Sequence, residues 1–331
     1  MAEPFIRLSF EARQELLLEA GRYLKREAAI LEKDIWVCWA LEVLFKLELP
    51  MVFKGGTSLS KVYQAIQRFS EDLDITIDHK ASGDVLEDPL SALVSNTKRR
   101  EFSERMRTFT IATVQDLILP HIHAMSKDLP INKIAVVENG DQIYLEYQAV
   151  TQSNYILPQI KLEFGARNAV EPSQIHQISA DILAWDVANQ LEFPEATVPV
   201  LLAERTYWEK VTLIHAEITR KNPKTTMERY SRHWYDLAQL SQHQAGIQAA
   251  QRFDLRDHVI RTKTALYGVA GVNYDAVAQQ HCCLVPKDEL NSALERDFNE
   301  MLSAGMFDGT PPTWDDIIVT LTRLEQQINQ G

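Results

Sequence analysis

Apolar residues recur along this chain at two different spacings, and the spacing separates helical from extended segments. Residues 11–24 (EARQELLLEAGRYL) and 34–47 (DIWVCWALEVLFKL) carry apolar residues at the spacing of an amphipathic helix. Asp34 begins the second segment and is a candidate N-cap. Residues 98–126 and most of the chain beyond Val200 show the same helical pattern. We therefore expect helices at the start of the chain and throughout its last third.

Strict alternation of apolar and polar residues predicts strands between these helical regions. In residues 71–78 (EDLDITID), leucine and isoleucine alternate with acidic residues and threonine, which is typical of a strand with one buried face. Residues 142–150 (QIYLEYQAV) and 159–164 (QIKLEF) alternate in the same way. A strand or turn region around Pro194 and Pro199 follows. Residues 81–96 carry no such pattern and are expected to form a loop.

A Gly-Gly pair interrupts the chain directly after a short apolar run. Residues 51–54 (MVFK) read as a buried strand that Gly55 and Gly56 end. Thr57 or Ser58 can then cap a helix that runs to about residue 68. Together these patterns predict an α+β protein, with a mixed α/β domain over residues 1–198 and a helical domain over residues 199–331.

Composition is that of an ordinary globular protein. The 331 residues are 45% hydrophobic and 24% charged, and no apolar run approaches the roughly 20 residues of a membrane span. The N-terminal segment lacks the features of a secretory signal. The three cysteines, Cys38, Cys282 and Cys283, form no disulfide or zinc-site pattern. We therefore expect a cytoplasmic protein with reduced thiols and no membrane partner.

Charge is unevenly distributed in this acidic chain. The net charge of −12 disfavours general binding to nucleic acid, which relies on a basic surface. One segment, residues 205–232, is nevertheless basic, and such a local excess is compatible with a confined phosphate site or with a solvated helix face. Its basic residues are Arg205, Lys210, Arg220, Lys221, Lys224, Arg229 and Arg232.

Two aspartates carry the clearest chemical signal. Asp72 and Asp74 are two residues apart on the predicted strand, so they project from one face about 7 Å apart along the chain. Paired carboxylates at this spacing can hold divalent cations such as Mg²⁺ or Mn²⁺, which clamp the oxygens of a phosphoryl group during transfer. Glu163, on the polar face of another strand, is a candidate third ligand. Taken alone, two aspartates in this pattern are more often the solvent-facing side of a half-buried sheet.

The Gly-Gly pair supplies a candidate phosphate site. Glycine allows close approach of the backbone, and a helix beginning at Ser58 would point free N–H groups at an anion. Gly55, Gly56, Thr57 and Ser58 are therefore candidates for binding the phosphates of a nucleotide, and Lys61 is a weaker one. Taken alone, such a turn more often only separates two elements of secondary structure.

In their order along the chain, these motifs resemble the AbiEii/AbiGii toxin family of the polymerase-beta-like nucleotidyltransferase superfamily. The matching segments are FKGGTSLSK (53–61), SEDLDITI (70–77), KLEF (161–164), ERTYWEKVTLIH (204–215) and SRHWYDLAQL (231–240). The resemblance implies a nucleotidyltransferase-type mixed sheet flanked by helices, followed by a helical domain. It also implies that Lys210 is an active-site lysine and that Asp236 supports the active site, either by pairing with Lys210 or by positioning the nucleophile.

The resemblance further implies the toxin half of a type IV toxin–antitoxin system. Such an enzyme would transfer a nucleoside monophosphate from an NTP to an RNA, with the 3′ end of tRNA as the expected acceptor and an antitoxin encoded next to it. Arg232 and His233 are candidate contacts to phosphate or RNA, whereas Trp208, Trp234 and Tyr235 are expected in the core. Two alternatives stay open: transfer to a protein hydroxyl, and a non-catalytic interaction module.

Overall fold

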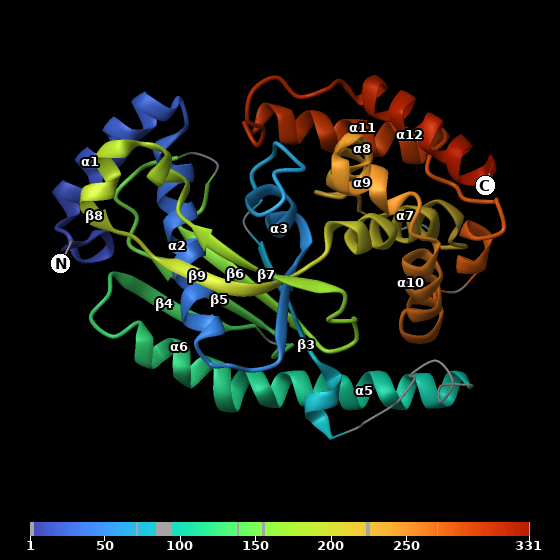
Figure 1. Ribbon diagram of the computed structural model, residues 1–331, viewed down its shortest axis with the longest axis horizontal. Coiled ribbons are helices and arrows are strands. Elements are labelled where there is room, and N and C mark those ends of the chain that lie inside the picture. The colour runs from blue at the N-terminus through green and yellow to red at the C-terminus, as the bar shows by residue number, and fades with distance from the viewer. Residues whose placement is uncertain are drawn as a thin grey trace. The chain divides into compact units, whose positions relative to one another are not determined.

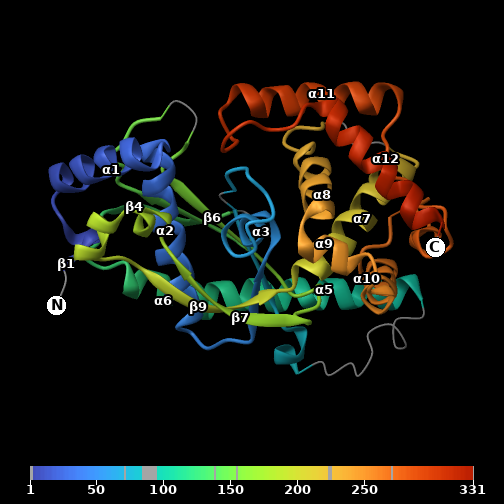
Figure 2. The ribbon, with the colours of Figure 1, turned by 45° about the horizontal axis from the view of Figure 1, so that its top comes forward.

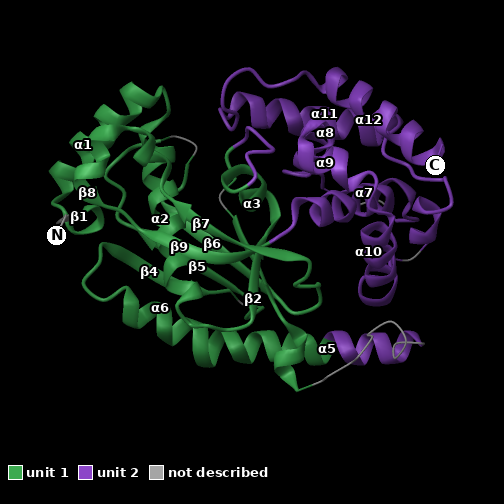
Figure 3. Ribbon diagram, in the orientation of Figure 1, with its two compact units in different colours: residues 1–62, 69–84, 104–200 green, residues 63–68, 85–103, 201–331 purple. Residues whose placement is uncertain are grey.

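The computed structural model describes residues 3–70, 72–83, 95–137, 139–153, 156–222, 226–269 and 271–330. The chain divides into two compact units (Figure 3). The first comprises residues 1–62, 69–84 and 104–200, and the second comprises residues 63–68, 85–103 and 201–331. Two short segments of the predicted first domain thus belong to the second unit. Most of the loop expected at 81–96 lies outside the described residues.

A seven-stranded mixed sheet forms the centre of the first unit (Figure 1). Its strands, in spatial order, are β4 (Ile131–Val136), β5 (Gln142–Tyr147), β6 (Gln159–Gly165), β3 (Asp72–Ile77), β2 (Met51–Lys54), β9 (Glu195–Leu201) and β7 (Ser173–Ser179). β3 is parallel to β6 and antiparallel to β2. β1 (Glu3–Pro4) and β8 (Leu191–Glu192) form a separate parallel pair. The strands predicted at 51–54, 71–78, 142–150 and 159–164 are confirmed, whereas β4 and β7 were not predicted.

Helices precede or connect the first strands of this sheet along the chain. They are α1 (Phe10–Leu24), α2 (Ala28–Phe45), α3 (Gly55–Lys61), α5 (Asn96–Thr113) and α6 (Leu119–Met125). α2 contacts α1, α6 and β6 (Figures 1 and 2). Trp36 of α2 stacks on Tyr147 of β5 with ring centroids 5.2 Å apart. Because side chains alternate along a strand, Tyr147 shares its face with the buried Ile143 and Leu145, and this face packs against α2.

The opposite, polar face of the sheet therefore carries the candidate chemistry. Buried apolar residues alternate with half-buried polar ones from Asp72 to Ile75 of β3 and from Gln159 to Phe164 of β6, whereas Thr76 at the end of β3 is buried. Leu73 and Leu162, paired in register, are fully buried. Burial of one such side chain contributes about 1.5–3 kcal/mol. A shift of the strand register by one residue would turn these apolar side chains to the polar face, so it is strongly disfavoured.

Two helix boundaries differ from those predicted. α2 begins at Ala28, so Asp34 lies inside the helix and is not its N-cap. α3 begins at Gly55 and ends at Lys61, so neither Thr57 nor Ser58 caps it and it does not continue to residue 68. The chain after Lys61 instead makes tertiary bonds: the Tyr63 hydroxyl donates to the carbonyl of Leu201 at 3.0 Å.

The part of the second unit after residue 200 is helical, as predicted. Its helices are α7 (Ala203–Thr219), α8 (Arg232–Gln242), α9 (Gln244–Ala249), α10 (Phe253–Leu266), α11 (Asp288–Ser303) and α12 (Trp314–Gln330). Trp208 and Trp234 are buried, and their indole N–H groups donate to the carbonyls of Ala249 and Leu284 at 2.9 and 3.0 Å. Tyr235 is buried as well. These three aromatic residues are therefore core residues, as expected.

The mixed sheet, its flanking helices and the helical C-terminal region confirm the α+β class. Among the described residues, no helix combines the length and apolar character needed to span a membrane. In the same residues all three cysteines are free thiols, with Cys38 and Cys282 buried.

Candidate functional site

Asp72 and Asp74 lie on the polar face of β3, both half-buried. In the register of the sheet, Asp74 is opposite Lys54 of β2 and Glu163 of β6, and Asp72 is opposite Lys161. Residues opposite each other on neighbouring strands project from the same face. The sheet therefore gathers three carboxylates and two ammonium groups on one surface of the first unit.

Gly55 lies directly against the carboxylate of Asp74. Its φ is +86°, a region that favours glycine, and a Cβ placed on it would lie 2.0 Å from Oδ2 of Asp74. No side chain fits that space. The Gly-Gly turn thus lies against the Asp-x-Asp strand within the first unit, and glycine at position 55 permits this close approach.

The hydroxyl groups of the turn bind protein oxygens. Thr57 Oγ1 donates to the backbone carbonyl of Asp72 at 2.6 Å, and Ser58 Oγ donates to the carbonyl of Gly55 at 2.9 Å. The Thr57 bond ties α3 to the start of β3, so it holds the turn beside the aspartates. The helix begins at Gly55 rather than at Ser58, and the backbone N–H groups of its first turn therefore include Gly55 and Gly56.

Lys61 is a structural residue rather than a phosphate ligand. Its side chain is buried, and its Nζ donates to Asp34 Oδ1 at 2.5 Å and to Asp181 Oδ1 at 2.9 Å. Burial works against its charge, but the two carboxylates raise the pKa of Lys61 above its usual value. The lysine therefore stays charged and fastens the end of α3 to α2.

Glu163 lies beside Asp74, but its carboxylate already has partners. It forms an ion pair with Lys161 and accepts a hydrogen bond from Gln142 Nε2 at 3.0 Å. Within the part of the chain that the structure describes, no three side chains of His, Cys, Asp or Glu are grouped to hold a metal ion. The role of Glu163 as a third metal ligand stays a prediction.

Two carboxylates on one strand nevertheless fit a magnesium-type ion. Mg²⁺ commonly takes one or two protein carboxylates and completes its shell with water and substrate phosphates, because it loses its water reluctantly. Asp72 and Asp74 offer such a pair. The close approach of the Gly55 backbone to Asp74 leaves no side chain between the turn and the carboxylate. These residues therefore suit a metal-bound triphosphate better than an ion enclosed by protein alone.

The second unit holds a separate buried group of charged residues. Lys210 on α7 donates from Nζ to Asp236 Oδ2 on α8 at 2.7 Å, and their exposed fractions are 7% and 0%. The pairing of these two residues, one of the two roles expected for Asp236, is confirmed. Burial lowers the pKa of Lys210, and Asp236 offsets part of that effect.

Arg68 is a third member of this group that the sequence did not reveal. Its Nε donates to Asp236 Oδ1 at 2.7 Å and its Nη2 to Asp236 Oδ2 at 2.9 Å. Although burial works to raise the pKa of Asp236, Arg68 and Lys210 hold it well below its usual range. Arg68 lies in an irregular segment 168 residues from Asp236, so no local pattern could have signalled the contact.

The basic segment 205–232 is not a continuous solvent-facing surface. Arg205 and Lys210 are buried, and Arg205 pairs with Glu209 at 3.1 Å. Arg220 pairs with Glu217 at 3.0 Å. Lys224 lies outside the described residues. The remaining described basic residues are half-buried or exposed, so the segment's positive charge is divided between the core and the surface.

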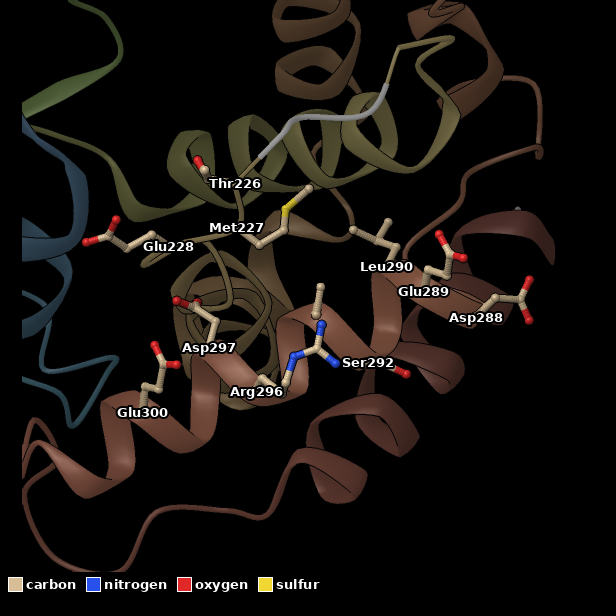
Figure 4. A pocket seen from close by; sticks show the side chains of 11 residues that line it. Thr226, Met227, Glu228, Asp288, Glu289, Leu290, Ser292, Arg296, Asp297 and Glu300 are labelled. Carbon is tan, nitrogen blue, oxygen red and sulfur yellow. The ribbon is translucent and has the colours of Figure 1, made fainter.

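An open pocket of about 1000 Å³ in the second unit lies between residues 226–228 and α11 (Figure 4). Five acidic residues contribute to its lining, against one arginine: Glu228, Asp288, Glu289, Asp297 and Glu300 with Arg296. Asp297 also accepts hydrogen bonds from the backbone N–H groups of Arg229 and Ser231, which lead into α8. The negative charge of this lining disfavours the binding of a phosphate group that carries no metal ion.

The candidate residues thus form two groups. Gly55, Gly56, Thr57, Ser58, Asp72, Asp74 and Glu163 lie in the first unit, and Lys210 and Asp236 lie in the second. Their convergence at one active site stays a prediction.

Comparison with known protein families gives a match over most of the chain. A family model described as "Nucleotidyl transferase AbiEii toxin, Type IV TA system" matches residues 39–319. The matched range contains both groups of candidate residues. No curated protein matches the chain.

Proposed function

The chain belongs to the AbiEii family of nucleotidyl transferase toxins of type IV toxin–antitoxin systems, and from this premise we propose that it transfers a nucleoside monophosphate from an NTP to the 3′ end of an RNA, with tRNA as the acceptor. The observation that carries the proposal is the contact between the Gly55 backbone and the Asp74 carboxylate. It joins a turn able to bind phosphate to a carboxylate pair able to bind a metal ion.

Asp72 and Asp74 would hold Mg²⁺ or Mn²⁺, which when bound supplies positive charge to the triphosphate oxygens. The backbone of the turn from Gly55 to Ser58 binds the phosphates, because glycine leaves their approach unobstructed. The acceptor hydroxyl attacks the α-phosphorus, the bond to pyrophosphate breaks, and the hydroxyl proton passes to a base. Pyrophosphate leaves with the electron pair of the broken bond.

Lys210 offsets the negative charge that grows on the α-phosphate during transfer. Arg68, which binds Asp236, is separated from Asp72 by residues 69–71 in the sequence. This short connection supports the proposal that both groups serve one site.

Asp236 acts through Lys210 rather than as the base. A general base works best when its pKa is near the working pH, whereas two cations hold the pKa of Asp236 far lower. Glu163 is the better candidate to orient the acceptor hydroxyl, because it is half-buried on the polar face beside Asp74.

The family's place in toxin–antitoxin systems implies an antitoxin partner. We propose that this partner is encoded next to the toxin. We also propose that the enzyme acts in the cytoplasm, where NTPs and tRNA are found.

The acceptor is tested by incubating the full chain with labelled NTPs and Mg²⁺, together with either total RNA or total protein. We expect label on RNA in the size range of tRNA. Label on protein alone would overturn the RNA acceptor, and no label on either would overturn transfer altogether.

Two variants make this assay specific for the carboxylate pair. Asp74→Asn should abolish labelling, since it removes a metal ligand without changing the volume of the side chain. Glu146→Gln is the matched control, because Glu146 is a half-buried carboxylate on β5 of the same sheet, opposite Gln159 rather than beside the aspartates. Equal labelling by wild type and Asp74→Asn would refute the assignment of the site.

A further inference from the structure

Asp236 is bound by two cations in two different ways. Arg68 spans both oxygens of the carboxylate, at 2.7 Å to Oδ1 and 2.9 Å to Oδ2. Lys210 reaches only Oδ2, at 2.7 Å. A bidentate guanidinium fixes the plane of a carboxylate, whereas an ammonium acts as a point charge that imposes no orientation on it. The orientation of Asp236, and with it the position of Lys210, is therefore set by Arg68.

The charges of this group do not balance. Arg68, Asp236 and Lys210 are 3%, 0% and 7% exposed, so solvent screens them little. One carboxylate between two cations leaves a net charge of about +1. Without Arg68, Asp236 and Lys210 would form a neutral pair whose field largely cancels. When Arg68 is present, its positive charge balances the negative charge of Asp236. The positive charge of Lys210 is then not cancelled.

We propose that Arg68 is a positioning residue for nucleotidyl transfer. Arg68 balances the charge of Asp236 and fixes the orientation of its carboxylate. Lys210 therefore presents an uncancelled positive charge to the phosphates of the nucleotide. The inference rests on the proposed role of Lys210 in the transfer. Arg68 itself acts through Asp236 and need not touch the substrate.

The groups around Lys210 give this inference a measurable consequence. Burial lowers the pKa of Lys210, Asp236 raises it, and Arg68 and Arg232 lower it further. His233 also lies in this group, and burial beside Lys210 and Arg232 holds the pKa of its ring well below the usual value, so it is neutral at pH 7. Removing the charge of Arg68 should therefore move the titration of Lys210 to higher pH.

The decisive test is the titration of Lys210 in the full chain carrying ¹³Cε-labelled lysine, followed by NMR, with Lys210→Met to assign the signal. In Arg68→Gln we expect the Lys210 signal to titrate at higher pH than in wild type. We also expect kcat for transfer from Mg²⁺–NTP to fall at least roughly tenfold, and the basic limb of the kcat–pH profile to move in the same direction as the NMR signal.

Two further variants separate this role from a purely structural one. Arg205→Gln is the matched control, because Arg205 is an equally buried arginine of the second unit that pairs with Glu209. It should leave the Lys210 titration in place. Arg68→Lys keeps the charge but cannot hold both oxygens in the same way. It should leave the Lys210 titration near that of wild type while kcat falls several-fold.

These outcomes decide the inference even if Arg68→Gln does not fold. Wild-type kcat in Arg68→Lys overturns the positioning role, and an unmoved Lys210 signal in folded Arg68→Gln overturns the charge role. A moved signal in Arg68→Gln, combined with a wild-type chain that transfers no label from any NTP, supports the charge assignment and overturns the proposed function instead.

Discussion

Gly55 offers the sharpest test of how the sheet and the turn are assembled. An alanine at this position would adopt φ near +86°, which costs about 1–2 kcal/mol for a residue with a Cβ. The same Cβ would lie 2.0 Å from Oδ2 and 2.9 Å from Cγ of Asp74. Forcing Asp74 off its rotamer adds about 0.5–1.5 kcal/mol. We therefore expect Gly55→Ala to lower the free energy of unfolding by about 2–3 kcal/mol.

The substitution Gly83→Ala separates the cost of the backbone conformation from the cost of the contact with Asp74. The φ of Gly83 is +80°, close to that of Gly55, but a Cβ there would meet nothing within 4 Å. Gly83→Ala should therefore show only the backbone part, about 1–2 kcal/mol. The excess of Gly55→Ala over Gly83→Ala measures the contact with Asp74. Urea unfolding of the two variants, each in the wild-type and Asp74→Ala backgrounds, completes a double-mutant cycle.

In the Asp74→Ala background we expect the excess to shrink to a small remainder, because the two closest atoms are gone and only Cβ of residue 74, at 3.1 Å, is left. An excess of the same size with and without the Asp74 side chain would refute the contact. In the wild-type background, Gly55→Ala should also reduce transfer about a hundredfold, since displacement of a reacting group by about 1 Å has that effect. Gly83→Ala should leave transfer near the wild-type rate.

Three further predictions concern charge, metal and thiols. The pKa of Asp236 is lower in the folded than in the unfolded protein. Its contribution to stability is therefore fully present above the unfolded pKa of about 4 and is lost as pH falls through the lower, folded value. In acid titrations, the difference in unfolding free energy between wild type and Asp236→Asn should shrink below about pH 4. Mn²⁺ affinity, followed by EPR with NTP present, should fall more in Asp74→Asn than in Glu163→Gln, because Lys161 and the neighbouring glutamine already hold Glu163; the reverse order would make Glu163 the principal ligand. Iodoacetamide should alkylate the native protein at Cys283 alone, since Cys38 and Cys282 are buried whereas Cys283 is partly exposed, although burial raises the pKa of all three thiols. Mass spectrometry would reveal any modification of a buried cysteine.

The sequence predicted those parts of the fold that local periodicity encodes. Alternation in EDLDITID placed Asp72 and Asp74 on one face of a strand, and that face is the polar one in the structure. The start of α3 was misplaced because Gly55, usually a helix breaker, adopts a positive φ at the first helical position. Its end was misplaced because residues 62–68 keep a helical pattern while tertiary bonds take the chain elsewhere, as with the Gln67 N–H that donates to Tyr235 Oη.

The charged group around Asp236 shows why part of the site was hidden. The resemblance to a known family identified Lys210 and Asp236, and their pairing on α7 and α8 was among the roles expected. Arg68 carried no signal, because an arginine in an irregular segment usually faces solvent. Its burial follows from a carboxylate 168 residues away that needs a bidentate partner once it is removed from water. Long-range electrostatic requirements of this kind leave no trace in local spacing.

Transfer of a nucleoside monophosphate is distinguished from transfer of a phosphoryl group by the position of the label in the NTP. Each NTP is supplied in parallel with label on its α-phosphate or on its γ-phosphate, together with Mg²⁺, RNA and the full chain. We expect the α label to join the RNA while the γ label is released as pyrophosphate, and we expect Asp74→Asn to abolish both events. A γ label on the acceptor, with the α label left on the nucleoside diphosphate, would show phosphoryl transfer and refute nucleotidyl transfer.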